Sequence, residues 1–326
     1  MINEKRLRVL DANILYLIGA ILFIIVGSYV QQKSLKFGLL ITEYILVLLP
    51  PIVYLAANKM NIKKNLRLNK LSIPHGLMII CITLLMYPVA VFANAFMMLL
   101  LSLLGNLNIP QLPTASNTSE YIVLMLIVSL SAGICEEVFF RGFVLRGYEA
   151  LGKNKAIVIS AILFGVFHFN VYNLLGPIVL GLVFGYLVVL TDSLYAGIIG
   201  HIANNGFAVT LGFLVSIISE KLPIPDAGAS AEIPTTMALL GSLVFFGILA
   251  VITGFIAYHF FRVIKRDMEK QRKAVEVYTE AEAEYISSDK AVETTRASEF
   301  IPLLLIIPIF LYVAFIQISE IIKLGQ

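Results

Sequence analysis

The sequence predicts an all-α fold: a polytopic integral membrane helical bundle of about nine transmembrane helices. Hydrophobic residues make up 59% and charged residues only 14% of the 326-residue chain, which excludes an ordinary soluble domain. The apolar residues come in blocks that reach or approach the about 20 residues needed to cross a bilayer. The ten-residue alternation of a membrane β-barrel is absent from the sequence, so we expect helices to satisfy the backbone.

About nine apolar blocks define the expected helices. The first follows basic residues but lacks a small-residue cleavage site, so we expect a retained span rather than a signal peptide. The fifth is long enough only if its helix starts near Lys153. The count falls to about eight if the last block does not span. The blocks are residues 14–30, 39–57, 77–104, 121–149, 156–169, 174–190, 194–218, 237–261 and 300–318.

The positions of Lys and Arg predict the orientation of the bundle. With a cytoplasmic N-terminus and alternating crossings, 20 of the 24 basic residues fall in cytoplasmic segments. This is the bias that the positive-inside rule describes. The cytoplasmic segments are the N-terminus, Lys59 to Lys70, Arg141 to Lys155 and Arg262 to Arg296, and the residues left outside are Lys33, Lys36, Lys221 and Lys323.

Ionisable and amide side chains gather in three of the apolar blocks, between residues 136 and 205. Such residues inside a span cost several kcal/mol and are functional candidates by default. If the chain turns near Gly152, Glu136 and His168 lie at similar depth, about 22–26 Å from the turn. A turn near Asp192 brings the residues of the later block to about 13–20 Å. The cluster consists of Glu136, Glu137, Arg141, His168, His201, Asn204 and Asn205.

The spacings within the blocks predict which of these side chains share a helix face. Glu137 and Arg141 are four residues apart, a favourable ion-pair spacing, while Glu136 points about 100° away. The pairs His201 with Asn205 and Phe164 with His168 have the same four-residue spacing. One carboxylate can thus be held by Arg141 while the other faces a cavity. A purely structural polar network between helices remains an alternative.

Three motifs carry a family resemblance: Glu136-Glu137-Val-Phe-Phe-Arg141, Phe164-Gly-Val-Phe-His168 and His201-Ile-Ala-Asn-Asn205. They resemble the EExxxR, FxxxH and HxxxN/D motifs of the CPBP family (CAAX proteases and bacteriocin-processing enzymes, also called Abi), which are intramembrane glutamic endopeptidases. The resemblance implies that Glu136 activates water with assistance from His168, and that His201 and Asn205 form an oxyanion hole. It implies supporting or substrate-binding roles for Glu137 and Arg141, to which we add Phe164 and Asn204 as neighbours.

The residues themselves favour the same chemistry, because peptide hydrolysis needs a positioned base for water and donors for the oxyanion. A zinc-dependent membrane metalloprotease, with Glu136, His168 and His201 as ligands, is the runner-up, although no H-E-x-x-H occurs. Serine chemistry at Ser129 or Ser131 lacks a Gly-x-Ser-Gly sequence. The sequence is also compatible with a non-catalytic membrane scaffold, a bacteriocin-immunity protein or a proton-coupled transporter.

The predicted organisation has five parts. Residues 1–119 hold three helices and an external loop, and 120–215 form the catalytic core. Residues 216–261 hold an external loop and a helix, 262–299 a charged cytoplasmic segment, and 300–326 the last helix. The charged segment is basic and then acidic, so we expect a solvated helix extension and linker with anionic headgroups near its basic half.

The remaining expectations concern partners, location and single residues. We expect a peptide or protein substrate in or near the membrane, a possible cytoplasmic partner at 262–299, no nucleic acid and no cofactor. The expected location is the bacterial plasma membrane. Cys81 and Cys135, both in apolar blocks, are expected to be reduced and buried. Glu43, in the second block, is expected near a membrane interface.

Overall fold

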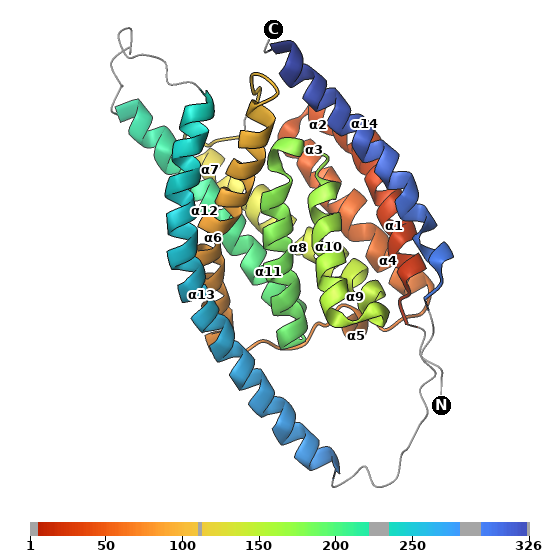
Figure 1. Cartoon of the computed structure of the whole chain (residues 1–326). Coiled ribbons are helices and arrows are strands. Elements are labelled where there is room, and N and C mark those ends of the chain that lie inside the picture. The colour runs from red at the N-terminus through yellow and green to blue at the C-terminus, as the bar shows by residue number, and fades with distance from the viewer. Residues whose placement is uncertain (1–5, 110–112, 222–234, 281–294, 325–326) are drawn as a thin grey trace.

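The fold is a bundle of helices, seen in a computed structural model that describes residues 6–109, 113–221, 235–280 and 295–324 (Figure 1). Within these ranges all regular structure is helical, which confirms the predicted fold class. Every one of the apolar blocks lies in a helical rod, so the predicted number of helices is also supported.

Several rods are composite, because short π-helical stretches interrupt them. The first two rods are α1 (Val9–Leu22), η1 (Phe23–Gly27) and α2 (Ser28–Lys33), then α3 (Leu35–Ile41), η2 (Thr42–Leu48) and α4 (Leu49–Ala57). After α5 (Ile62–Asn65) and α6 (Ile73–Ser102), the fourth rod comprises α7 (Thr118–Leu124), η3 (Met125–Ser131), α8 (Ala132–Glu137), η4 (Val138–Val144), α9 (Leu145–Tyr148) and η5 (Glu149–Leu151). The rest are α10 (Lys153–Phe167), η6 (Val171–Asn173), α11 (Leu175–Thr191), α12 (Leu194–Lys221), α13 (Thr235–Glu280), η7 (Ala297–Phe300) and α14 (Ile301–Leu324).

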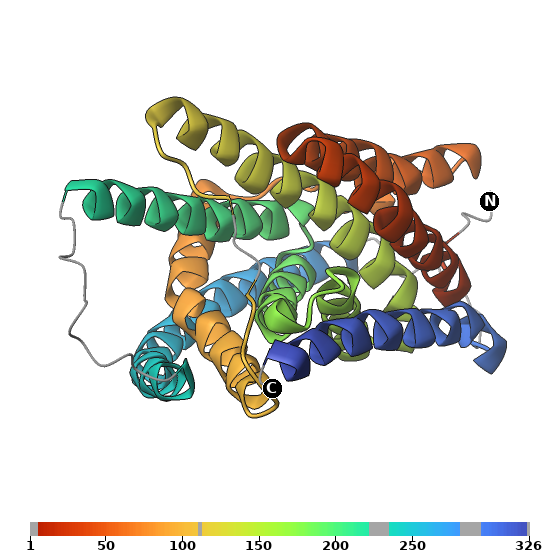
Figure 2. The ribbon, with the colours of Figure 1, turned by 90° about the horizontal axis from the view of Figure 1, so that it is seen from above.

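Among the described residues, seven helical stretches are long and apolar enough to cross a membrane, including the one that ends in α14. The two shorter rods are α10, with 15 residues, and α11, with 17. Figure 2 shows α10 and α11 in the interior, ringed by the longer helices. Each of them still has an exposed apolar face, with Val158 and Ile162 on α10 and Leu182 and Tyr186 on α11.

The ends of these inner helices follow the local signals in the sequence. Helix α10 begins at Lys153, as predicted, directly after Gly152, whose φ of 103° reverses the chain. Helix α11 ends before Asp192, which adopts a left-handed conformation. The two helices pack closely, since a Cβ on Gly181 would lie 2.8 Å from the Cα of Ala161.

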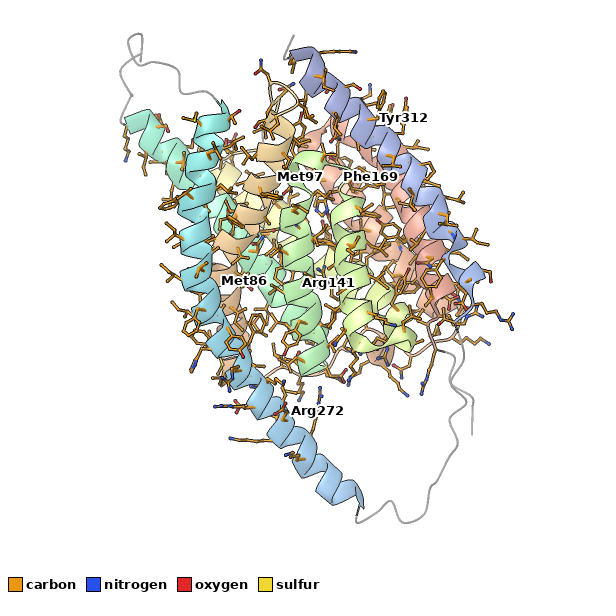
Figure 3. All side chains as sticks on the ribbon, in the orientation of Figure 1. Met86, Met97, Arg141, Phe169, Arg272 and Tyr312 are labelled. Atoms are coloured by element: carbon orange, nitrogen blue, oxygen red, sulfur yellow. The ribbon has the colours of Figure 1, made fainter. Side chains whose placement is uncertain are left out.

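The basic segments gather at one end of the bundle, where Figure 1 shows the start of α1, α5, α9 and the lower part of α13. This arrangement agrees with the predicted alternation of crossings. Arg141, which was counted with the cytoplasmic basic residues and was also expected in the intramembrane cluster, is only 1% exposed, and Figure 3 shows it in the middle of the bundle. Its depth follows from its position in η4, well before the turn at Gly152.

Arg67 connects three segments at the basic end of the bundle. Its Nε donates to Oδ1 of Asp192 at 2.7 Å, and its Nη2 donates to Glu149. The carbonyl of Arg67 also accepts from the backbone N–H of Leu194 at 2.9 Å. One side chain therefore joins the loop after α5, the end of the fourth rod and the turn between α11 and α12.

The fold also tests the expectations for the charged segment and for the cysteines. Helix α13 continues past the apolar block to Glu280, and Figure 3 shows Arg272 on the part that projects beyond the bundle, as expected of a solvated extension. Residues 281–294 of the expected linker lie outside the described residues. Cys135 is buried, but the prediction for Cys81 was wrong, because that residue is exposed. Only a third of the most apolar stretch of α6 is buried, and Cys81 faces away from the bundle.

We predict that Arg67→Ala lowers the free energy of unfolding by about 2–4 kcal/mol, because it leaves the largely buried Glu149 with one cationic partner fewer. The apparent Tm of the purified protein in detergent checks this. The exposed Lys63→Ala, in the neighbouring α5, is the matched control and should leave the Tm unchanged. Equal Tm values for the two variants would contradict the role given to Arg67.

Candidate active site

The candidate site is built on α8, a short helix between the π-helical stretches η3 and η4. π-Helical turns inside α-helices occur frequently at functional sites. Glu136 and Glu137 are the last two residues of α8. Helix α12 supplies His201, and the end of α10 supplies His168. Three rods thus contribute to one cluster.

Glu137 is the centre of the cluster and is completely buried. Its Oε1 accepts from Nη1 of Arg141 at 2.7 Å and lies 3.0 Å from Nδ1 of His201, which donates when protonated. Helix α12 comes this close because residue 197 is glycine: a Cβ there would lie 2.4 Å from Oε2 of Glu137. The predicted pair of Glu137 and Arg141 is formed, and the structure adds His201 to it.

Arg141 is surrounded by aromatic rings. Its guanidinium carbon lies 4.4 Å from the ring centre of Phe164 and 5.7 Å from that of Phe184. Phe184 stacks on His201 with ring centres 5.5 Å apart, so the same ring contacts the arginine and the histidine. These cation–π contacts supplement the single carboxylate partner that Arg141 has in the described part of the chain.

Glu136 is held differently from Glu137. Its side chain is 17% exposed, and its Oε2 lies 3.9 Å from Nε2 of His201, beyond direct hydrogen-bond distance. This oxygen is buried and has no hydrogen-bond partner among the described residues. Oε2 of Glu137 also lacks a partner among the described residues, but that side chain is completely enclosed, whereas Glu136 is partly exposed. Of the two adjacent glutamates, Glu136 is therefore the one that water and substrate can reach.

His168 joins the cluster through Phe164. It follows the last residue of α10, and its Nδ1 lies 2.8 Å from the carbonyl oxygen of Phe164. The ring of Phe164 lies edge-on to His168 and to His201, with ring centres 5.0 and 5.8 Å away. Within the described residues His168 makes no hydrogen bond or ion pair with Glu136. The other ring nitrogen of His168, Nε2, takes no part in the contact between Nδ1 and Phe164.

Asn204 and Asn205 extend the cluster along α12. Nδ2 of Asn205 donates to the carbonyl oxygen of Val128, in η3, at 2.8 Å, and its Oδ1 accepts from Nδ2 of Asn204 at 3.0 Å. His201 and Asn205 therefore both contact the fourth rod, as their four-residue spacing predicted. An amide nitrogen carries two hydrogens, so one N–H of Asn205 remains after the bond to Val128.

The hydroxyls of the two candidate serine nucleophiles are both engaged in hydrogen bonds. Ser129 donates to the carbonyl oxygen of Ile202, and Ser131 to that of Leu126, each at 2.8 Å, so both hydroxyls connect or brace helices. In the part of the chain that the structure describes, no three His, Cys, Asp or Glu side chains are grouped to hold a metal ion.

Glu43 is a site neighbour that the sequence analysis did not assign to the cluster. It is only 7% exposed, and its Oε2 has no hydrogen-bond partner among the described residues. It interacts electrostatically with Glu136, because η2 packs against α8. The signal that could have found it is its charge inside an apolar block, which by itself marks a functional candidate.

Two amide side chains from outside the core hold the loop that follows His168. Gln317 of α14 accepts from the N–H of Val171 at 2.9 Å and donates to the carbonyl oxygen of Phe169 at 2.8 Å. Asn94 of α6 accepts from the N–H of Gly176 at 2.7 Å. Phe169 has a positive φ of 46°, which a bulky residue rarely adopts without support. The last helix of the chain thus helps to position His168.

We predict that Arg141→Met lowers the free energy of unfolding by about 3–5 kcal/mol, because it leaves the buried carboxylate of Glu137 without its cation. Adding Glu137→Gln should recover about 2 kcal/mol or more, since the unpaired charge is then removed. Thermal unfolding of the single and double variants measures this coupling.

Arg146→Met is the control on the same rod. The side chain of Arg146 is 30% exposed where it pairs with Glu149, so its loss should cost about 1 kcal/mol or less. Additive effects of Arg141→Met and Glu137→Gln would contradict the coupling.

We also predict that Gln317→Leu speeds amide hydrogen exchange at Val171, because the acceptor of that N–H is lost. Exchange in the middle of α10, at Ala161, should not change. Tyr312→Leu, on the exposed face of α14 seen in Figure 3, is the matched control. Unchanged exchange at Val171 would show that Gln317 does not hold the loop.

Comparison with known proteins places the site in a family context. Residues 118–207 match the family model of the type II CAAX prenyl endopeptidases described as Rce1-like. The matched segment contains all three motifs, which confirms the predicted resemblance to the CPBP family. YdiL, a candidate membrane peptidase of Bacillus subtilis (strain 168), is 33% identical over 94 residues.

The matched region is a limited part of both proteins. The 94 aligned residues make up 28% of this chain and 38% of the length of that curated relative. No solved structure matches the chain. At the level of the family, the integral membrane protein described here is similar to membrane peptidases of the CAAX-protease type.

Proposed function

We propose that this protein is an intramembrane endopeptidase that hydrolyses peptide bonds of a membrane-associated peptide or protein with water activated by Glu136 and His168. The observation that carries the proposal is the unpartnered Oε2 of Glu136, 3.9 Å from Nε2 of His201, inside the segment that matches the peptidase family. A carboxylate with a free oxygen beside possible donors is the minimum that this hydrolysis needs.

In this proposal Glu136 takes a proton from a water molecule as the water attacks the scissile carbonyl carbon. His168, whose Nδ1 is engaged at Phe164, orients the same water through Nε2. The carbon–nitrogen bond then breaks, and the carboxylic acid of Glu136 returns the proton to the leaving amine. No covalent intermediate with the protein forms.

His201 and Asn205 would stabilise the tetrahedral oxyanion. Nε2 of His201 would supply one donor, and the contact of Nδ1 with the Glu137 carboxylate holds the ring so that Nε2 faces Glu136. Asn205 would donate through the N–H that Val128 does not use. Arg141 would hold the Glu137 carboxylate in place, so its role is to position the histidine.

The proposed location is the bacterial plasma membrane, with the basic end of the bundle in the cytoplasm. Support comes from the segregation of basic residues and from the bacterial relative. We propose a peptide or protein substrate that reaches the site within or beside the bilayer. The charged part of α13 and the residues after it could additionally contact a cytoplasmic partner.

We predict that Glu136→Gln reduces peptide cleavage by about 10²–10⁴-fold, because the amide cannot accept the proton of water. Comparing the membrane peptides of cells that carry the wild-type protein with those that carry Glu136→Gln reveals the products. Glu320→Gln, on the exposed face of α14, is the matched control and should give the wild-type pattern.

Two outcomes would replace this mechanism with a different one. If the cellular phenotype survives both Glu136→Gln and His168→Ala, the protein acts as a scaffold or immunity factor and the proposal is wrong. If a chelator abolishes cleavage and zinc restores it, a metalloprotease mechanism replaces the glutamic one.

A further inference from the structure

A cavity of about 690 Å³ lies between α11 and α13, on the face of α11 turned away from the candidate active site. Phe184 of α11 points inward to stack on His201, whereas Leu182, Val183 and Tyr186 line the cavity. This volume lies within the about 300–1,000 Å³ typical of small-molecule sites. The cavity is therefore separate from the peptidase chemistry proposed above.

The cavity exists because α13 packs mainly along α6 and only weakly against α11. His75 of α6 lies 3.6 Å from Asp267, which fixes α13 to its neighbour. Below the cavity, Nη2 of Arg272 donates to the carbonyl oxygen of Leu190 and bridges the gap to α11 at 3.1 Å. Tyr186 and Phe261 face each other across it with ring centres 5.6 Å apart.

The lining changes from apolar to basic along the direction of the helices. Leu182, Val183 and Tyr258 lie on the side of the bilayer centre, and the basic side chains lie one to two turns nearer the basic end. The basic residues are Arg262, Lys265 and Arg266, accompanied by one acidic residue, Glu269. Lys265 lies 3.9 Å from Glu269, which leaves an excess of positive charge at Arg262 and Arg266.

Such a gradient complements an amphiphile rather than a soluble anion. Tyrosines are enriched where membrane meets water, and basic pockets between membrane helices bind phosphate-bearing lipid headgroups. We propose that the cavity between α11 and α13 binds an anionic phospholipid, with its phosphate at Arg262, Lys265 and Arg266 and an acyl chain along Leu182 and Val183.

The test exploits the lack of tryptophan in this chain. Tyr258→Trp places one fluorophore in the cavity and keeps an aromatic ring beside Arg262, whose guanidinium carbon lies 5.8 Å from the Tyr258 ring centre. Tyr312→Trp places it instead on the exposed face of α14. Each full-length variant is reconstituted in phosphatidylcholine vesicles that contain an equal mole fraction of brominated phosphatidylglycerol or brominated phosphatidylcholine, which quench a nearby tryptophan.

We expect the tryptophan at position 258 to report a relative binding constant about fivefold or more in favour of phosphatidylglycerol, and the one at position 312 a constant near one. Arg262→Gln, Lys265→Gln and Arg266→Gln together should abolish the preference at position 258. Lys270→Gln with Lys273→Gln, on the same helix but outside the cavity lining, should preserve it.

Three results would overturn the proposal. The first is an equal preference at positions 258 and 312, which indicates a bulk surface effect. The second is loss of the preference on adding inorganic phosphate, which identifies a free anion as the ligand. The third is an unchanged preference in the triple variant, which would show that the three basic residues do not bind the lipid.

Discussion

The buried carboxylate of Glu137 is the constraint on which the rest of the structure depends. A charge at this depth is costly unless it is paired, and Glu137 is paired twice, with Arg141 one turn along its own rod and with His201 on α12. The first pair is local, but the second joins residues 64 positions apart in the chain. Separating α8 from α12 would leave an anion without one of its partners, so the network fixes the relative position of the two helices.

This network also gives the two neighbouring glutamates different surroundings. Glu137 is completely enclosed and contacts the arginine and one ring nitrogen of the histidine, whereas Glu136 is partly exposed and faces the other ring nitrogen of His201 with an oxygen that has no partner among the described residues. Aromatic rings complete the enclosure: Phe164 contacts Arg141, His168 and His201, and so links residues from three rods. In a low-dielectric interior such fixed contacts are worth more than they would be in water.

The helices outside the segment that matches the peptidase family contribute to the site without belonging to its motifs. Helix α14 and α6 hold the loop after His168 through Gln317 and Asn94, and η2 brings a further carboxyl group, Glu43, next to Glu136. Helix α13 forms the second wall of the cavity whose other wall is α11. A single inner helix, α11, thus presents Phe184 to the candidate site and a different face to the membrane side.

The sequence by itself determined whatever depends on neighbours along the chain. Block lengths and breakers placed the helices and the turns at Gly152 and Asp192, and the four-residue spacing predicted the pairing of Glu137 with Arg141. It also indicated that polar groups of three blocks share one depth. Only the tertiary structure decided which way each helix faces: that Glu43 lies beside Glu136, that Cys81 is exposed and that Glu137 rather than Glu136 bonds His201. The reason is physical, since rotation and crossing of membrane helices are set by packing between distant segments, and in an almost uniformly apolar chain few residues record it.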